Sequence, residues 1–156
     1  MSAVSMASRR RDRVFSPRRT AVAVAVGFLI VVAFQISLTL GAPFGAAALG
    51  GANAGALPAE LRMVTAVSAA IWVVAAVIVL ARGGLAIVRV PASLSRWGTW
   101  ALVGYLALGA LMNLASSSPW ERFGWAPFTV VLFGLTLFLA RSGREGQSAQ
   151  PTGAQP

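Results

Sequence analysis

Four long runs of apolar residues alternate with shorter polar segments along the chain of 156 residues. The runs cover residues 20–40, 63–81, 97–115 and 126–140, and none of them contains a charged residue. A helix needs about 20 mostly apolar residues to cross ~30 Å of hydrocarbon at 1.5 Å per residue. The pattern therefore predicts an all-α membrane protein with four transmembrane helices in an antiparallel bundle.

The segments around the runs complete the predicted organisation. An outer loop covers residues 41–62, an inner connection covers 82–96, and an outer turn covers 116–125. The polar, basic residues 1–19 and the Gly/Ser/Gln/Pro-rich residues 141–156 have nothing to form a core, so both are predicted to be disordered cytoplasmic segments. The first run could instead belong to a signal peptide. It is longer than the roughly 7–15 apolar residues of such peptides, however, and three more runs follow it.

Composition and charge support a membrane location. The chain is 57% hydrophobic and 11% charged, whereas soluble domains carry about 25% charged residues. Its net charge of +9 comes from arginine, all of it outside the apolar runs. We therefore interpret the arginines as topology determinants and contacts for anionic lipid headgroups, not as nucleic-acid contacts.

The distribution of arginine predicts the orientation. With both termini in the cytoplasm, eleven arginines lie on the inner side and only Arg62 and Arg122 lie on the outer side. This bias agrees with the positive-inside rule. Because the composition is rich in alanine, glycine and arginine and lacks lysine, we expect a multi-pass protein of the bacterial inner membrane.

Two missing residue types narrow the possible chemistry. The chain has no cysteine and no histidine, which excludes thiol–disulfide exchange and removes the commonest metal ligands and general base. The serines at 116–118 have no histidine or lysine beside them to activate a nucleophile. We therefore expect no catalytic residues, no cofactor and no metal.

Polar side chains within the predicted spans gather near the outer surface, and Thr136 is the main exception. One interpretation is a set of hydrogen bonds between helices, worth about 0.6–2 kcal/mol each. The other is a polar pocket open to the outside. The residues predicted to form this packing or ligand site are Gln35, Thr39, Ser68, Asn113, Ser116 and Ser118.

The outer loop lies next to this polar layer. Residues 41–59 are uncharged and rich in glycine and alanine, so the loop could pack into the mouth of the bundle as a lid or remain a flexible spacer. Charged residues follow it at Glu60 and Arg62, and two more, Glu121 and Arg122, occupy the outer turn. We expect ion pairs between these two groups across the mouth.

Two strings, LGAPFGAAALGG…LPAELR and LMNLASSSPWERFGWAP, carry a family resemblance. They resemble segments of small bacterial four-span membrane proteins without an assigned activity, which implies a four-helix inner-membrane protein. The sequence as a whole favours a non-enzymatic membrane protein with an outward-facing polar site for a small ligand or a partner membrane protein. The alternative is a small transporter or channel component that acts as a homo-oligomer.

Overall fold

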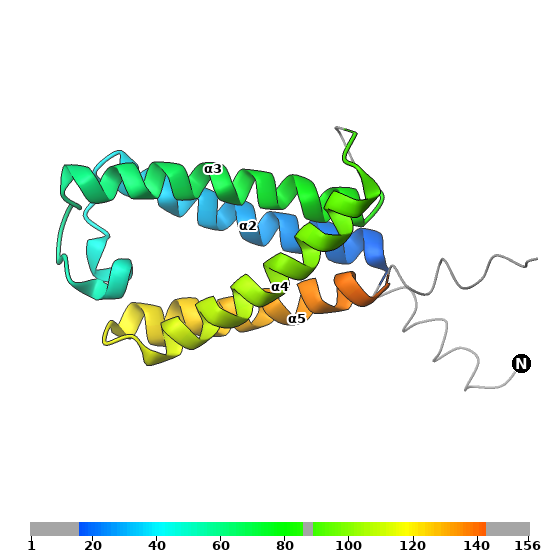
Figure 1. The fold of residues 1–156 in the computed structure, drawn as a ribbon. Helices are drawn as coiled ribbons and strands as arrows, with labels where there is room; N and C mark the ends of the chain where they lie inside the picture. Colours follow the sequence, from blue (N-terminus) through cyan, green and yellow to red (C-terminus); the bar gives the residue numbers. More distant parts are fainter. Residues whose placement is uncertain (1–15, 86–88, 143–156) are drawn as a thin grey trace, which may run out of the picture.

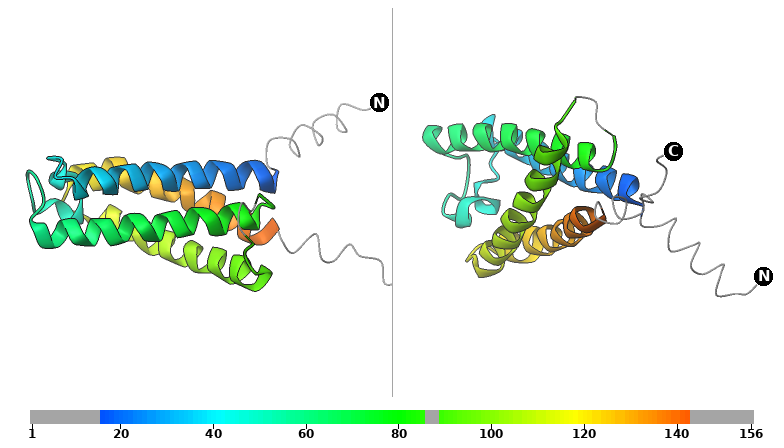
Figure 2. Two further views of the ribbon diagram at one scale, coloured as in Figure 1. Left: turned by 90° about the horizontal axis from the view of Figure 1, so that it is seen from above. Right: turned by 45° about the vertical axis from the view of Figure 1, so that its right-hand side comes forward.

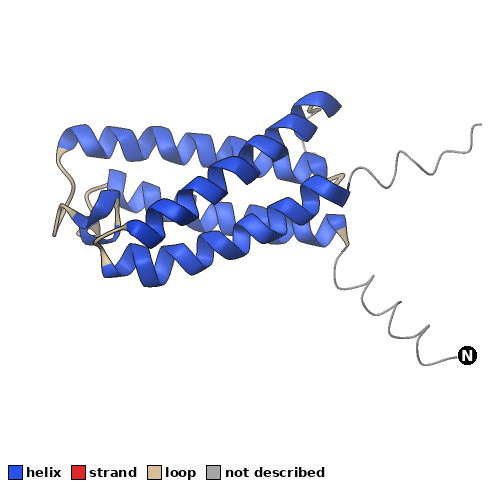
Figure 3. Ribbon diagram, turned by 60° about the horizontal axis from the view of Figure 1, so that its bottom comes forward, coloured by secondary structure: helices blue, strands red, loops and turns tan. Residues whose placement is uncertain are grey.

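The structure, a computed structural model, describes residues 16–85 and 89–142. Its regular elements are helical throughout these ranges (Figure 3). By length and composition, four helices are long and apolar enough to cross a membrane, as the sequence predicts, when η3 and α5 are counted as one. The elements are α2 (Pro17–Thr39), α3 (Ala59–Arg82), α4 (Ala92–Ala115), the π-helix η3 (Glu121–Trp125) and α5 (Ala126–Ser142).

Prolines start three of the helices earlier than the apolar pattern predicts. Ser16 caps α2, accepting a hydrogen bond from the backbone N–H of Arg19 at 3.3 Å, and Pro17 follows it. Pro58 and Pro91 occupy the N-cap positions of α3 and α4. Proline favours helix starts because its φ is already fixed near the helical value and it has no N–H to leave unbonded.

Several predicted boundaries move as a result. Arg18 and Arg19, predicted to lie in the arm, belong to the first turn of α2, and Arg96, predicted to lie in the inner connection, belongs to α4. Much of the predicted outer turn is helical, because the chain is already helical at Trp120 and η3 starts at Glu121. The rest of the predicted arm (residues 1–15) and tail (143–156) lies outside the described residues.

The four helices form two closely packed pairs, α2 with α3 and α4 with α5. Figures 1 and 2 show the two pairs diverging toward the end that holds the α2–α3 loop, while α4 crosses close to α3 at the opposite end. At that opposite end Arg82 donates a hydrogen bond from Nη2 to the Ala140 carbonyl at 3.0 Å. Gly83 lies so close to Ala21 that it leaves no room for a side chain. The start of α2 and the ends of α3 and α5 therefore meet at one end of the bundle.

The main hydrophobic core joins all four helices in the half of the bundle nearer this end. Small residues let the helices approach, and at Gly27 an added Cβ would clash with Leu132 of α5. Among the described residues, no core that joins all four helices lies in the diverging half, and this leaves space for the α2–α3 loop. The buried core residues are Ala21, Val24, Ala25, Phe28, Ala75, Ala76, Val79, Leu106, Leu132 and Leu139.

Candidate functional site

The α2–α3 loop, residues 40–58, is folded against the diverging ends of the helices; we call it the covering loop. It contains two short 3₁₀ helices, η1 (Gly45–Ala47) and η2 (Leu49–Gly51). Gly45 donates its N–H to the Gly55 carbonyl at 2.9 Å, and an added Cβ at Gly45 would lie 2.6 Å from that same oxygen. Ala48 and Leu57 are buried against Leu38 of α2 in a small second hydrophobic cluster. The loop thus has a defined fold of its own.

Three hydrogen bonds attach the covering loop to the segment between α4 and η3. Ser118 donates from Oγ to the Ala46 carbonyl at 2.7 Å, and Ser117 donates to the Gly50 carbonyl at 3.3 Å. Glu121 accepts the Gly50 N–H through Oε1 at 2.9 Å. Gly50 has a φ of +79°, a conformation that glycine adopts without steric cost. These bonds join the two helix pairs at the end where they diverge.

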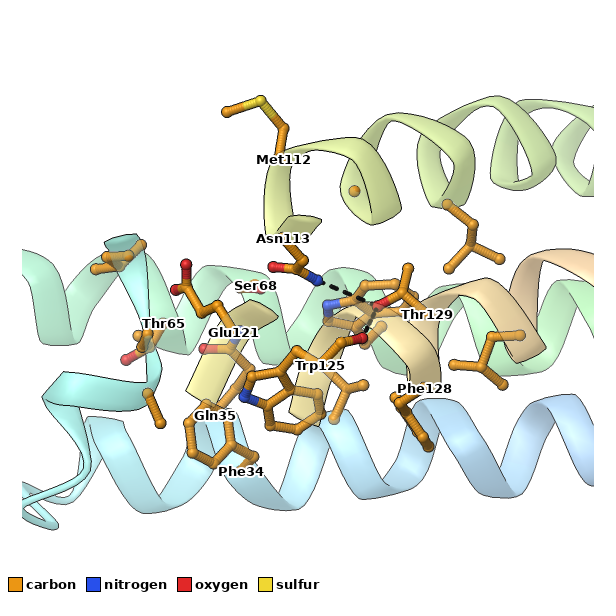
Figure 4. A pocket seen from close by; sticks show the side chains of 18 of the residues that line it. Phe34, Gln35, Thr65, Ser68, Met112, Asn113, Glu121, Trp125, Phe128 and Thr129 are labelled. Atoms are coloured by element: carbon orange, nitrogen blue, oxygen red, sulfur yellow. Dashed lines mark hydrogen bonds between the residues drawn. The ribbon is translucent and has the colours of Figure 1, made fainter. Parts of the chain in front are cut away.

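A cavity of about 240 Å³ lies beneath the loop, between the two helix pairs. Residues 47–49 of the covering loop form part of its wall. Figure 4 shows that Gln35, Asn113 and Glu121, from three different elements, point toward the same space. The remaining lining residues are Val31, Phe34, Thr65, Ser68, Trp72, Tyr105, Leu106, Gly109, Met112, Trp125, Phe128, Thr129 and Leu132.

The polar groups of the cavity are only partly bonded within the protein. Asn113 donates from Nδ2 to Thr129 Oγ1 at 3.2 Å, and Thr129 in turn donates to the Trp125 carbonyl at 2.7 Å. Gln35 Oε1 is buried and has no hydrogen-bond partner among the described residues. Buried polar atoms of this kind normally have a partner, so this oxygen is an unsatisfied acceptor on a residue that lines the cavity.

Aromatic rings line the cavity in two groups. On the side of α2 and α5, Trp125 lies 4.8 Å from Phe34 and 5.6 Å from Phe128, measured between ring centroids. On the side of α3 and α4, Trp72 and Tyr105 are in edge contact at 5.6 Å. The space between the helix pairs is therefore bounded by rigid, largely apolar surfaces with a few polar groups, an arrangement common in small-molecule sites.

The structure brings half of the six predicted site residues to the cavity: Gln35, Ser68 and Asn113 line it. The other three do not line the cavity and make hydrogen bonds elsewhere. Thr39 Oγ1 bonds the Gln35 carbonyl and Thr65 Oγ1, both at 2.9 Å, Ser116 Oγ accepts the Ser118 N–H at 3.1 Å, and Ser118 holds the covering loop.

The predicted ion pairs across the mouth do not form among the described residues. Arg62 instead donates from Nε to the Thr39 carbonyl at 2.7 Å, and Glu121 is turned inward, only 8% exposed, to accept the Gly50 N–H. Glu60 and Arg122 are exposed. The backbone groups of the α2 end and of the covering loop outcompete the opposite charges because they are held at hydrogen-bonding distance by the fold.

Sequence reasoning missed the inward orientation of Glu121 and the contribution of Trp125. The π-helical turn that carries both residues inserts an extra residue before α5, and this changes which side chains face the cavity. The signal available in the sequence was Pro119, followed within six residues by one carboxylate, Glu121, and three aromatic residues. That signal indicates a helix start and does not indicate a π-helix.

Comparisons with known proteins do not identify the chain: no protein-family model, no curated protein and no solved structure matches it.

Proposed function

We propose that this protein is a non-enzymatic integral membrane protein that binds a small ligand in the cavity beneath the covering loop. The observation that carries the proposal is the buried, unbonded Gln35 Oε1 at the wall of a cavity that a hydrogen-bonded loop covers. If the polar residues served only to hold helices together, this oxygen should have found a partner on a neighbouring helix.

The positions of the arginines support an antiparallel bundle with both termini in the cytoplasm of a bacterial cell. Four of them, Arg18, Arg82, Arg96 and Arg141, lie within the first or last five residues of the four long helices, away from the covering loop. The positive-inside rule places such a basic end in the cytoplasm and favours contacts with anionic lipid headgroups there. The covering loop and the cavity then face the outside.

The covering loop controls access in this proposal. Its attachment to the α4–η3 segment consists of two serine hydrogen bonds, each worth about 0.5–1.5 kcal/mol net, and one bond to the Glu121 carboxylate, worth about 1.5–3 kcal/mol. Such a contact can open without disturbing the core, which lies in the other half of the bundle. Ligand exchange from the outer aqueous phase therefore requires only a local movement.

The hydroxyl groups near the cavity support binding more than catalysis. Ser118 donates to a loop carbonyl, and Thr65 donates to the Arg62 carbonyl at 2.8 Å. A nucleophilic hydroxyl needs a base within hydrogen-bonding reach. No described residue provides such a base for either hydroxyl.

A single-cysteine experiment tests whether the cavity is a water-accessible site. The chain has no native cysteine, so Ser68→Cys in a nanodisc offers one thiol, at the cavity wall, to a charged methanethiosulfonate reagent. Val67→Cys is the matched control, because Val67 is 55% exposed on the outside of the bundle at nearly the same depth. We expect Ser68→Cys to react and Val67→Cys to remain unmodified. If Ser68→Cys does not react, or if both thiols react alike, the cavity is not an aqueous site.

A further inference from the structure

We propose that the ligand is an organic cation with a primary ammonium group and one apolar chain. This inference rests on the proposed function and adds the chemical class of the ligand. The ammonium group occupies the cavity beside Glu121, and the chain leaves it through an apolar groove that opens sideways between α2 and η3–α5.

The charge of the cavity favours a cation. Glu121 is the one charged side chain among the described residues that line it, and it is 8% exposed. Its only described hydrogen bond is to the neutral Gly50 N–H, and no described arginine pairs with it. A buried carboxylate is costly unless an opposite charge or several hydrogen bonds compensate it. A bound ammonium group supplies that compensation.

The hydrogen-bonding groups favour an ammonium group that carries N–H donors. Gln35 Oε1 is a buried acceptor without a partner, and Asn113 uses its Nδ2 for Thr129 and keeps its amide oxygen free of described partners. Together with Glu121 these groups offer oxygen acceptors from three elements. A primary ammonium has three donors and no acceptor, which matches this set.

The aromatic walls add to the preference for positive charge. Five aromatic residues line the cavity: Trp125, Phe34 and Phe128 in one group of touching rings, and Trp72 and Tyr105 in another. Cations within about 6 Å of such ring faces are attracted by the ring quadrupole, and more strongly in a desolvated site. An anionic or purely neutral ligand gains nothing comparable from these walls.

The groove accounts for the apolar chain. It has a volume of about 660 Å³ and shares four lining residues with the cavity, Phe34, Ala47, Trp125 and Phe128, so the two spaces adjoin. Its other walls are uncharged: Ile30, Pro43, Phe44, Ala46, Trp120 and Gly124. The cavity alone is smaller than the roughly 300–1,000 Å³ of typical drug-sized sites. A head group therefore fits the cavity while the rest of an amphiphile lies in the groove.

Calorimetric titration of the full-length protein in phosphatidylcholine nanodiscs tests the inference, with empty nanodiscs subtracted to remove partitioning. The probes are dodecylamine, which is protonated at pH 7 as a lysine side chain is, and dodecanol, which has the same chain without the charge. Hydrogen bonds to a charged group are worth roughly 10- to 100-fold in affinity. We expect dodecylamine to bind at least about 10-fold more tightly than dodecanol.

Two substitutions test whether Glu121 causes the preference for dodecylamine over dodecanol. Glu121→Gln removes the charge but keeps an oxygen for the Gly50 N–H, and it should bring the two affinities within about 3-fold of each other. Glu60→Gln makes the same change at an exposed carboxylate and should leave the preference intact. Equal binding of the two probes to the unmodified protein overturns the inference and needs no variant. If Ser68→Cys nevertheless reacts with the aqueous reagent, the proposed site stands and only the ligand class is wrong.

Discussion

The hydroxyl of Ser118 makes the shortest of the three hydrogen bonds that attach the covering loop, and removing it tests whether the loop controls access to the cavity. In Ser118→Ala the 2.7 Å bond to the Ala46 carbonyl is lost, together with a weaker one in which Ser118 Oγ accepts the Glu121 N–H at 3.4 Å. A net 0.5–1.5 kcal/mol per hydrogen bond gives about 1–2 kcal/mol for the two. Loop opening should therefore become roughly 5- to 30-fold more frequent, since 1.4 kcal/mol corresponds to a factor of ten.

The assay is the rate at which Ser68→Cys reacts with the methanethiosulfonate reagent in nanodiscs. When opening and closing are fast relative to the reaction, the observed rate follows the open population. We expect the rate to rise by that factor in the Ser118→Ala background. Ser117→Ala is the control, because its bond to the Gly50 carbonyl is exposed and longer, 3.3 Å. It should change the rate by less than about 3-fold.

The thermal stability of the bundle should change little in Ser118→Ala, because the main core lies in the other half of the molecule. A Ser68→Cys rate that is readily measured but identical in the two backgrounds would refute the reasoning. In that case the reagent reaches the cavity by a route that does not involve the loop.

Three further substitutions test other parts of the structure. Gly45→Ala places a Cβ against the Asn53 and Gly55 carbonyls, which should loosen the covering loop and speed Ser68→Cys labelling by at least about 10-fold. The control is Gly55→Ala, where an added Cβ meets open space and labelling should not change. Gly27→Val should lower the free energy of unfolding by about 1–3 kcal/mol because it overpacks the contact with Leu132; thermal unfolding in detergent measures this, and a variant as stable as Gly134→Ala, at a position with free space, contradicts the close approach of α2 and α5. Thr136 is fully buried and its Oγ1 has no described partner, so Thr136→Val should raise the unfolding free energy by about 1 kcal/mol; a loss of stability would mean that the hydroxyl has a partner after all.

The sequence predicted the four apolar helices because their composition leaves few alternatives. The predicted starts of α2, α3 and α4, however, lie several residues after the observed starts. A hydropathy pattern stops where polar residues begin, and helices such as α4 continue through Arg96 and Ser93 to Pro91. Proline at a helix start is a sequence signal, and Pro58 and Pro91 mark the starts of α3 and α4. The ends of transmembrane helices are set by caps as well as by hydrophobicity.

The sequence predicted how far along the helices the candidate site lies, but it did not predict which side chains line it. The gathering of Gln35, Ser68 and Asn113 at one end of the bundle followed from their places in the spans, and all three line the cavity. The inward rotation of Glu121 did not follow, because it depends on a π-helical turn and on the Gly50 N–H, a group 71 residues away in the chain. Long-range contacts of this kind decide which of two neighbouring charges is buried.

The most direct test of the central claim is to determine from which side of the membrane a reagent reaches the cavity. Ser68→Cys is expressed in cells, and right-side-out and inverted membrane vesicles are treated with the same membrane-impermeant thiol reagent. The account predicts modification in right-side-out vesicles and none in inverted ones, because the covering loop faces the outside. Modification only in inverted vesicles, or in neither preparation, would contradict an outward-facing polar site beneath the loop.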